Sequence, residues 1–184
     1  PQQAMVHVEL ARLMLQNMQP AQARMQLDRA LSLDENSAAA ALLQLDLVEP
    51  NAPVATRLKA VLRAVRTNPL DVELCWQVGV LLDELGFAEE AALFFDHASE
   101  VFISANPGRD APAPYLIQRA YNLADCGRWE EATRWVQKAV TQAPDSNEAH
   151  FAARWILFKQ NRKAKADAHR QHLAPRFASI REPA

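Results

Sequence analysis

The residues of this chain that could carry acid–base chemistry are few, and none stands in a catalytic pattern. Asp96 and His97 are neighbours in the sequence, where a carboxylate can in other proteins orient an imidazole base. The segment around them has helical periodicity, and adjacent residues of a helix point about 100° apart. The two side chains therefore cannot act as one set, and His97 is expected to be an ordinary surface or interface residue.

Other signatures of chemistry are absent or incomplete. His169 and His172 are three residues apart, as two metal ligands can be, but only Asp167 lies close enough in sequence to be a third. The sequence has no G-x-S-x-G elbow, no H-E-x-x-H motif and no glycine-rich phosphate loop. We therefore expect a protein that is not an enzyme and that holds no metal and no cofactor.

Cysteine content and charge narrow the class further. Cys75 and Cys126 are too few for a disulfide framework and fit no zinc spacing, so we expect core thiols. Cytoplasmic and periplasmic locations are both compatible with this pattern. The formal net charge of -2 disfavours nucleic acid as a partner, and no apolar run approaches the roughly 20 residues of a membrane span. Because the sequence begins at Pro1, we expect a piece of a longer protein.

The elements that would position a binding site recur at fixed intervals. Ala30, Ala64 and Ala98 stand 34 residues apart. A second set recurs after 41 residues: Gly79, Gly86, Ala91, Phe95 and Ala98 reappear as Ala120, Gly127, Ala132, Val136 and Ala139. A period of this size indicates stacked supersecondary units. Few glycines and 49% hydrophobic residues favour helical units.

Apolar residues at helical spacing predict ten helices in five pairs, separated by short turns. Gly86, Gly127 and Asn161 lie between the helices of the last three pairs, where a left-handed residue is favoured. The helices are expected at 4–17 and 20–32, 36–48 and 53–66, 71–85 and 88–105, 113–126 and 129–142, and 146–160 and 162–173. The hairpins, about 4–32, 36–66, 71–105, 113–142 and 146–173, would form one array over 4–173, followed by a C-terminal tail at 174–184.

The repeated residues resemble the tetratricopeptide repeat (TPR) family, whose units carry small residues in both helices and an aromatic in the second. The clearest match is Gly79, Ala91, Phe95 and Ala98; further units carry Ala120, Gly127, Ala132, Val136, Ala139 and Pro144, and Ala11, Ala23, Leu27 and Ala30. The resemblance implies an all-α, right-handed superhelical solenoid of about five helix-turn-helix hairpins. Pairs two and five depart from the pattern: Leu45 with Arg57, and Arg154 with Ala166, replace contacts between small residues.

The same resemblance implies a concave wall lined by the first helix of each hairpin. Mapped onto this sequence, the wall is aromatic and acidic, which would suit a basic or apolar peptide. Its residues are Arg12, Asp46, Trp76, Val80, Asp83, Ile117, Tyr121, Phe151, Trp155 and Phe158, with Glu84 and Asp125 at the rim. The alternative for Trp76 and Trp155 is packing between neighbouring repeats.

Family members that hold the acidic C-terminal tails of chaperones use Lys, Arg and Asn on this wall. The matching positions here are Val8, Arg12, Leu45 and Glu73. Since Arg12 alone could bind a carboxylate, a co-chaperone of that type is not expected.

Two segments stand apart from the repeat. Seven extra residues lengthen the helix at 88–105 and its loop at 106–114. Val101, Phe102 and Ile103 are apolar enough to need a cover from either the next repeat or a partner, and the next repeat is favoured. The C-terminal end of the expected array is basic, with Lys159, Arg162, Lys163, Lys165, Arg170 and Arg176. It would act as a solvated cap or, alternatively, dock on an acidic partner.

These patterns favour a non-enzymatic protein–protein interaction scaffold that binds a peptide or partner helix in a concave groove. One alternative is a structural oligomerisation or spacer module, a homo-oligomer in which the acidic middle meets the basic end of a neighbour. Another is an accessory domain of a larger enzyme or assembly factor. The sequence identifies no particular partner.

Overall fold

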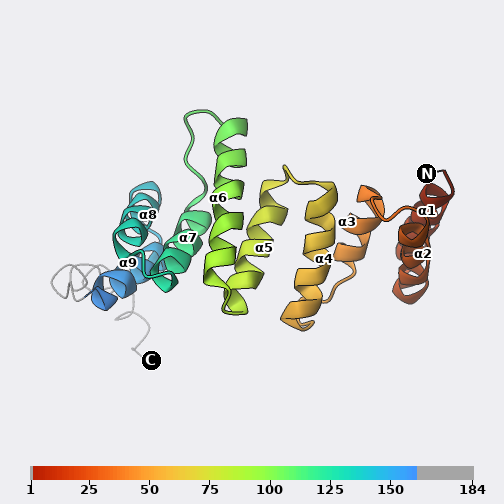
Figure 1. The fold of residues 1–184 in the computed structure, drawn as a ribbon, viewed down its shortest axis with the longest axis horizontal. Coiled ribbons are helices and arrows are strands. Elements are labelled where there is room, and N and C mark those ends of the chain that lie inside the picture. The colour runs from red at the N-terminus through yellow and green to blue at the C-terminus, as the bar shows by residue number, and fades with distance from the viewer. Residues whose placement is uncertain (1, 161–184) are drawn as a thin grey trace, which may run out of the picture. The chain divides into compact units, whose positions relative to one another are not determined.

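The computed structural model describes residues 2–160, and every regular element in that range is a helix (Figure 1). The helices are α1 (Gln2–Gln16), α2 (Pro20–Leu33), α3 (Ala38–Asp46), α4 (Val54–Thr67), α5 (Val72–Glu84), α6 (Ala88–Ala105), α7 (Ala113–Asp125), α8 (Trp129–Gln142) and α9 (Asn147–Lys159). Each boundary lies within two residues of the one expected from the sequence. The expected helix at 162–173, the turn at Asn161 and the tail at 174–184 lie outside the described residues.

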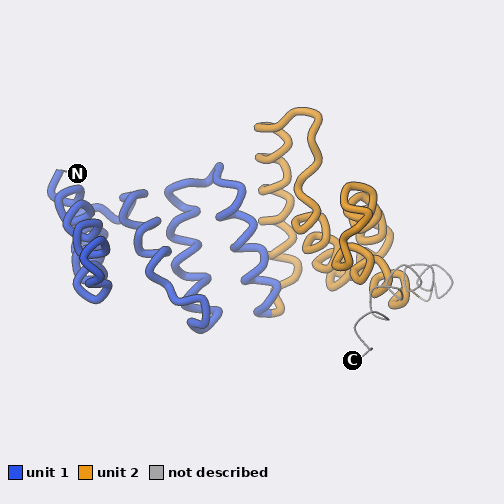
Figure 2. Tube along the Cα trace, turned by 180° about the vertical axis from the view of Figure 1, so that it is seen from behind, with its two compact units in different colours: residues 1–85 blue, residues 86–184 orange. Residues whose placement is uncertain are grey.

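The chain divides into two compact units, residues 1–85 and 86–184, drawn in different colours in Figure 2. The division between Leu85 and Gly86 falls inside the third expected hairpin. A single array over 4–173 therefore stays a prediction, and each unit is described by itself.

Unit 1 is built on close contacts between small side chains. Ala11 of α1 meets Ala23 and Ala30 of α2 in one buried cluster, which Ala40 of α3 joins. Small residues at a helix crossing let the two backbones approach closely, as the sequence pattern requires. From this cluster the unit continues as α3 against α4 and α4 against α5. The Asp71 carboxylate caps α5 by accepting a hydrogen bond from the Leu74 amide at 3.1 Å.

Unit 2 has a larger core, formed mainly by α7, α8 and α9. The repeat positions Ala120, Ala132, Val136 and Ala139 are all buried in it, next to Ile156 of α9. Gly127, between α7 and α8, has a φ of +73°. Only glycine adopts this left-handed conformation without strain, so Gly127 ends α7 as the sequence predicted.

The extra residues before α7 pack on the repeat that follows them. Phe102, near the end of α6, contacts the α7–α9 core, and Ala111 of the connecting loop is buried in it. The cover expected from the next repeat for Val101, Phe102 and Ile103 is therefore present at Phe102 but not at Ile103, which is 58% exposed.

An ionic link between a buried arginine and a half-exposed aspartate joins α6 to α7. Arg119 of α7 is 1% exposed and pairs with the Asp96 carboxylate of α6, while its Nη1 donates to Asn122 Oδ1 at 2.7 Å. Asn122 Nδ2 donates in turn to the carbonyl oxygen of Ala88 at 2.9 Å. Burial lowers the pKa of the Arg119 guanidinium, and the charge of Asp96 opposes that effect. Asp96, considered from the sequence only as an acid–base candidate, is thus part of the packing between helices.

The thiols fit the expected role in part. Cys75 is fully buried, and burial, followed by the charge of Asp71, raises the pKa of its thiol. Cys126 is half-buried. None of the described helices combines the length and the apolar composition needed to cross a membrane.

Candidate interaction site

An exposed aromatic surface lies on unit 2. Phe151, Trp155 and Phe158 follow one another at intervals of four and three residues, so they form one stripe along α9. Their exposed fractions are 41%, 37% and 57%. Together with Tyr121 of α7 they form what we call the aromatic face. All four residues were named from the sequence as members of the concave wall.

Ring contacts hold the centre of the aromatic face in place. The rings of Tyr121 and Trp155 meet edge to face, with centroids 5.5 Å apart and an interplanar angle of 76°. The ring centroids of Trp129 of α8 and Trp155 are 6.4 Å apart. Lys159 Nζ lies 5.6 Å from the centre of the Trp155 ring. Trp155 therefore presents its free surface from a fixed position.

Charged groups of both signs lie beside the aromatic face. Burial, and after it the charge of Glu148, raises the pKa of the Tyr121 hydroxyl, so a carboxylate lies near Tyr121. Lys159, at the C-terminal end of α9, lies over Trp155. Asp125, predicted for the rim of the wall, is exposed at the end of α7.

Other residues predicted for the wall are placed in the interior. Ile117 is buried in the α7–α9 core. Trp76 is only 5% exposed and, with Val80, lines a pocket of about 260 Å³ within unit 1. The burial of Trp76 favours the packing alternative for this side chain.

The charged wall residues of unit 1 lie at its surface or near it. Arg12 pairs with Glu9 at 3.4 Å, and Glu84 pairs with Arg57 at 2.7 Å. Asp46 is exposed at the end of α3, and Asp83 is half-buried. The Arg57–Glu84 pair explains how an arginine is accommodated where the repeat pattern has a small residue.

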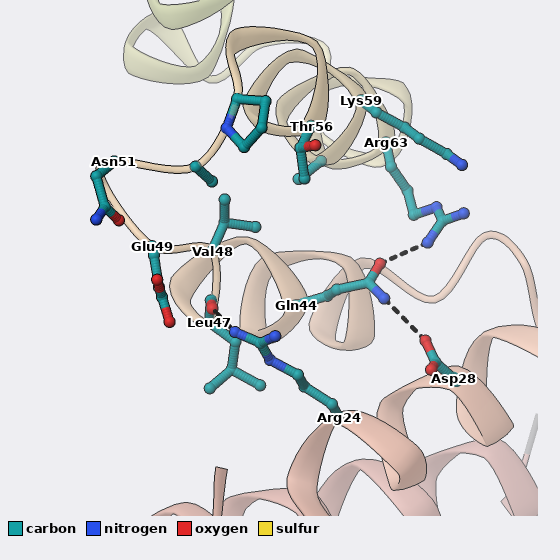
Figure 3. Close-up of a pocket in the computed structure, with 13 residues that line it drawn as sticks. Arg24, Asp28, Gln44, Leu47, Val48, Glu49, Asn51, Thr56, Lys59 and Arg63 are labelled. Atoms are coloured by element: carbon teal, nitrogen blue, oxygen red, sulfur yellow. Dashed lines mark hydrogen bonds between the residues drawn. The ribbon is translucent and has the colours of Figure 1, made fainter. Parts of the chain in front are cut away.

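A cleft in unit 1 was not predicted from the sequence. It has a volume of about 680 Å³ and lies among α2, α3, the 47–53 segment and the first half of α4 (Figure 3). We call it the α2–α4 cleft. From the sequence, the 47–53 segment, rich in Pro and Asn, was interpreted only as a break between helices. The irregular small-residue pattern of the second hairpin was the one signal of unusual packing here.

A chain of hydrogen bonds crosses the α2–α4 cleft. Gln44 of α3 accepts from Arg63 of α4 and donates through Nε2 to Asp28 of α2 at 3.0 Å (Figure 3). Arg24 Nη2 donates to the carbonyl oxygen of Leu47 at 2.6 Å. These bonds tie three helices and the start of the loop together around an open space. Within residues 2–160, no group of three or more His, Cys, Asp or Glu side chains is placed to hold a metal ion. His169 and His172 are outside that range.

The fold is similar to that of solved TPR structures, although sequence comparison finds no relative. No protein-family profile matches the sequence, and no curated protein is similar to it in sequence. Among solved structures, YrrB, a TPR protein with an unusual peptide-binding site, matches with a TM-score of 0.75 and 20% identity over 92% of this chain and 84% of its own.

Two further structures agree with that match. A fragment of MamA from Desulfovibrio magneticus has a TM-score of 0.74 at 13% identity, covering 99% of both chains. PilW, a type IV pilus biogenesis factor, has a TM-score of 0.64 at 17% identity, covering 97% of this chain and 79% of its own. The helical-repeat, TPR-like fold predicted from the sequence is confirmed by these likenesses.

Proposed function

We propose that this chain is a non-enzymatic protein-interaction scaffold that binds an apolar or basic peptide, or a partner helix, on the aromatic face of unit 2. The observation that carries the proposal is the stripe of three exposed aromatic side chains on α9. Contiguous apolar surface is uncommon on soluble proteins unless it is used, and rigid aromatic side chains are frequent centres of binding energy.

The charges beside the aromatic face would orient the ligand. Its apolar side chains would cover Phe151 and Phe158, while a Lys or Arg would approach Glu148 beside Tyr121. Trp155 needs little reordering on binding, because its ring contacts already fix it. The wall residues of unit 1, Arg12, Asp46, Trp76, Val80, Asp83 and Glu84, stay a prediction as further groove residues.

Loss of two aromatic side chains tests this proposal. Peptides are selected from a phage-displayed library on the full chain, and their affinity for the Trp155→Ala/Phe158→Ser variant is measured by fluorescence anisotropy. We expect a loss of about 30-fold, the effect of removing a binding hot spot. Leu93→Ser is the matched control, because Leu93 is a 68% exposed apolar residue on α6 outside the face. Unchanged peptide affinity in the double variant, with its circular dichroism preserved, would refute the proposal.

A second candidate, the structural oligomerisation module, is favoured by an apolar stripe on α1. Val6, Leu10 and Leu13 have exposed fractions of 60%, 38% and 54%. In two later first helices the residues of the same register are buried: Leu74, Val78 and Leu81 in α5, and Ala149, Ala153 and Ile156 in α9. A second copy of the chain would cover this face of α1, as would a preceding segment of a longer protein.

Light scattering distinguishes this candidate from a monomeric scaffold. An apolar contact through α1 is expected to give a dimer that persists at high salt, and Leu10→Gln/Leu13→Gln should return it to a monomer. Leu33→Gln on α2, also exposed, is the control. A dimer that dissociates with salt would instead support the electrostatic contact considered from the sequence, and a monomer at all concentrations would exclude both.

A further inference from the structure

One wall of the α2–α4 cleft is purely basic. Helix α4 carries Arg57, Lys59, Arg63 and Arg66 and no acidic residue. Arg57 pairs with Glu84, whereas Lys59 and Arg63 line the cleft and Arg66 lines a smaller hollow beside it. Lys59, Arg63 and Arg66 follow at intervals of four and three residues, so they lie on one face of α4. Lys59 and Arg63 extend from this helix in Figure 3.

The cations of the cleft are not neutralised by carboxylates of the described residues. Arg24, Arg63 and Arg66 donate to neutral acceptors: the carbonyl oxygen of Leu47, the amide of Gln44 and, at 2.8 Å, the carbonyl oxygen of Glu35. A guanidinium has five N–H donors, so each retains donors for a ligand. Lys59 makes no hydrogen bond or ion pair with another residue in the 2–160 range.

Acidic residues lie on the other side of the space. Asp28, Glu35 and Glu49 come from α2 and the two loops that flank α3. Asp28 already accepts the Gln44 amide. Four cations thus face three carboxylates, an excess of positive charge in a chain whose formal net charge is -2. The excess is concentrated on α4, so an acidic group is attracted to that wall.

We propose that the α2–α4 cleft is a second binding site, which takes an acidic peptide segment of a partner protein. Its Asp or Glu carboxylates would accept charge-assisted hydrogen bonds from Lys59, Arg63 and Arg66 along α4, with Arg24 opposite. A smaller hollow of about 310 Å³ shares Arg63 with the cleft and extends it to Arg66. The combined space is in the range of ligand sites and has room for several side chains.

This site is separate from the one proposed on unit 2. The aromatic face selects apolar and basic ligands, whereas the cleft selects acidic ones and lies on unit 1. It also does not use the first-helix positions that matched the carboxylate-binding wall. One chain could thus bind two partners of opposite charge. If an experiment refutes one of the two proposed sites, the proposal for the other site is unaffected.

Charge reversal at Lys59 tests the cleft. The probe is a fluorescein-labelled peptide of alternating Glu and Ser, and its affinity for the full chain is measured by anisotropy at low salt. Lys59→Glu is expected to weaken binding about tenfold or more, because a cation of the wall becomes an anion. It should not disturb folding, because Lys59 is exposed and has no partner among the described residues. Arg29→Glu, the same charge change at an exposed α2 position outside the cleft, should have less than about a threefold effect.

Four further results would each support or overturn the proposal of an acidic-peptide site in the α2–α4 cleft. Retained binding of the Glu-Ser peptide by the Trp155→Ala/Phe158→Ser variant supports a separate site. Equal losses in Lys59→Glu and Arg29→Glu would overturn the proposal, since they would show attraction by general charge. Equal affinity for a Gln-Ser peptide would also overturn it. So would a single-stranded DNA oligonucleotide that binds more tightly than the Glu-Ser peptide and loses affinity in Lys59→Glu, because the ligand class would then be wrong.

Discussion

Trp76→Ala is expected to lower the free energy of unfolding by about 3–5 kcal/mol, the usual cost of truncating a buried aromatic side chain. Trp76 lies among residues of the α3–α4 loop, α4 and α5, and a pocket of about 260 Å³ beside it is already open. Removing the indole enlarges that space. Neighbours such as Val61 and Leu81 are fixed in their helices and cannot close it fully.

Urea denaturation followed by circular dichroism measures the loss of unfolding free energy in Trp76→Ala. The rate at which Cys75 is alkylated measures local opening of the structure around Trp76. The Cys75 thiol is buried and its pKa is raised, so alkylation should be slow in the wild-type protein. In Trp76→Ala, opening of α5 should speed alkylation. Trp155→Ala is the matched control: the same atoms are deleted from a side chain that is more than one-third exposed, and about 1 kcal/mol is expected. Equal losses in the two variants would show that Trp76 is not a core residue.

Asp96→Ala is the second substitution with a large expected effect: it should lower the free energy of unfolding by about 3 kcal/mol. The substitution leaves the buried Arg119 charge without its carboxylate. We place the value at the low end of the range for broken buried pairs, because half of the Asp96 side chain faces water. The free energy of unfolding from urea denaturation is the measurement.

Arg119→Met supplies the contrast. A methionine fills much of the same volume without a charge, so this variant should lose less stability than Asp96→Ala, the main cost being the donor lost by Asn122. The double variant Asp96→Ala/Arg119→Met should be more stable than Asp96→Ala alone. If Asp96→Ala changes stability by less than about 0.5 kcal/mol, the pair behaves as an ordinary surface ion pair.

The helices could be predicted from the sequence because their signals are local. Periodic apolar residues mark each helix, Gly127 marks one helix end, and the 34-residue spacing of Ala30, Ala64 and Ala98 marks the crossings. All three alanines are fully buried in the structure. Two helix backbones can approach closely at a crossing only where the side chains are small, so this requirement does not depend on the other side chains of the partner helix.

The candidate surfaces could be predicted only in part. Phe151, Trp155 and Phe158 were found by their positions in the repeat, and they are exposed as a wall residue should be. Trp76 and Ile117 were named by the same rule but are buried. The position of a residue in the repeat predicts which face of the helix it lies on. Whether the residue is exposed depends on which other segments of the chain pack against that face.

The sequence by itself determined the helical-repeat fold, the helix boundaries and the small-residue crossings, because each follows from contacts between residues close in the chain or at fixed spacing. Only the tertiary structure decided that Arg119 reaches Asp96 and that Gln44 links Arg63 to Asp28. The same holds for the α2–α4 cleft. These depend on long polar side chains whose directions are set by packing, and on a loop whose path has no periodic signal.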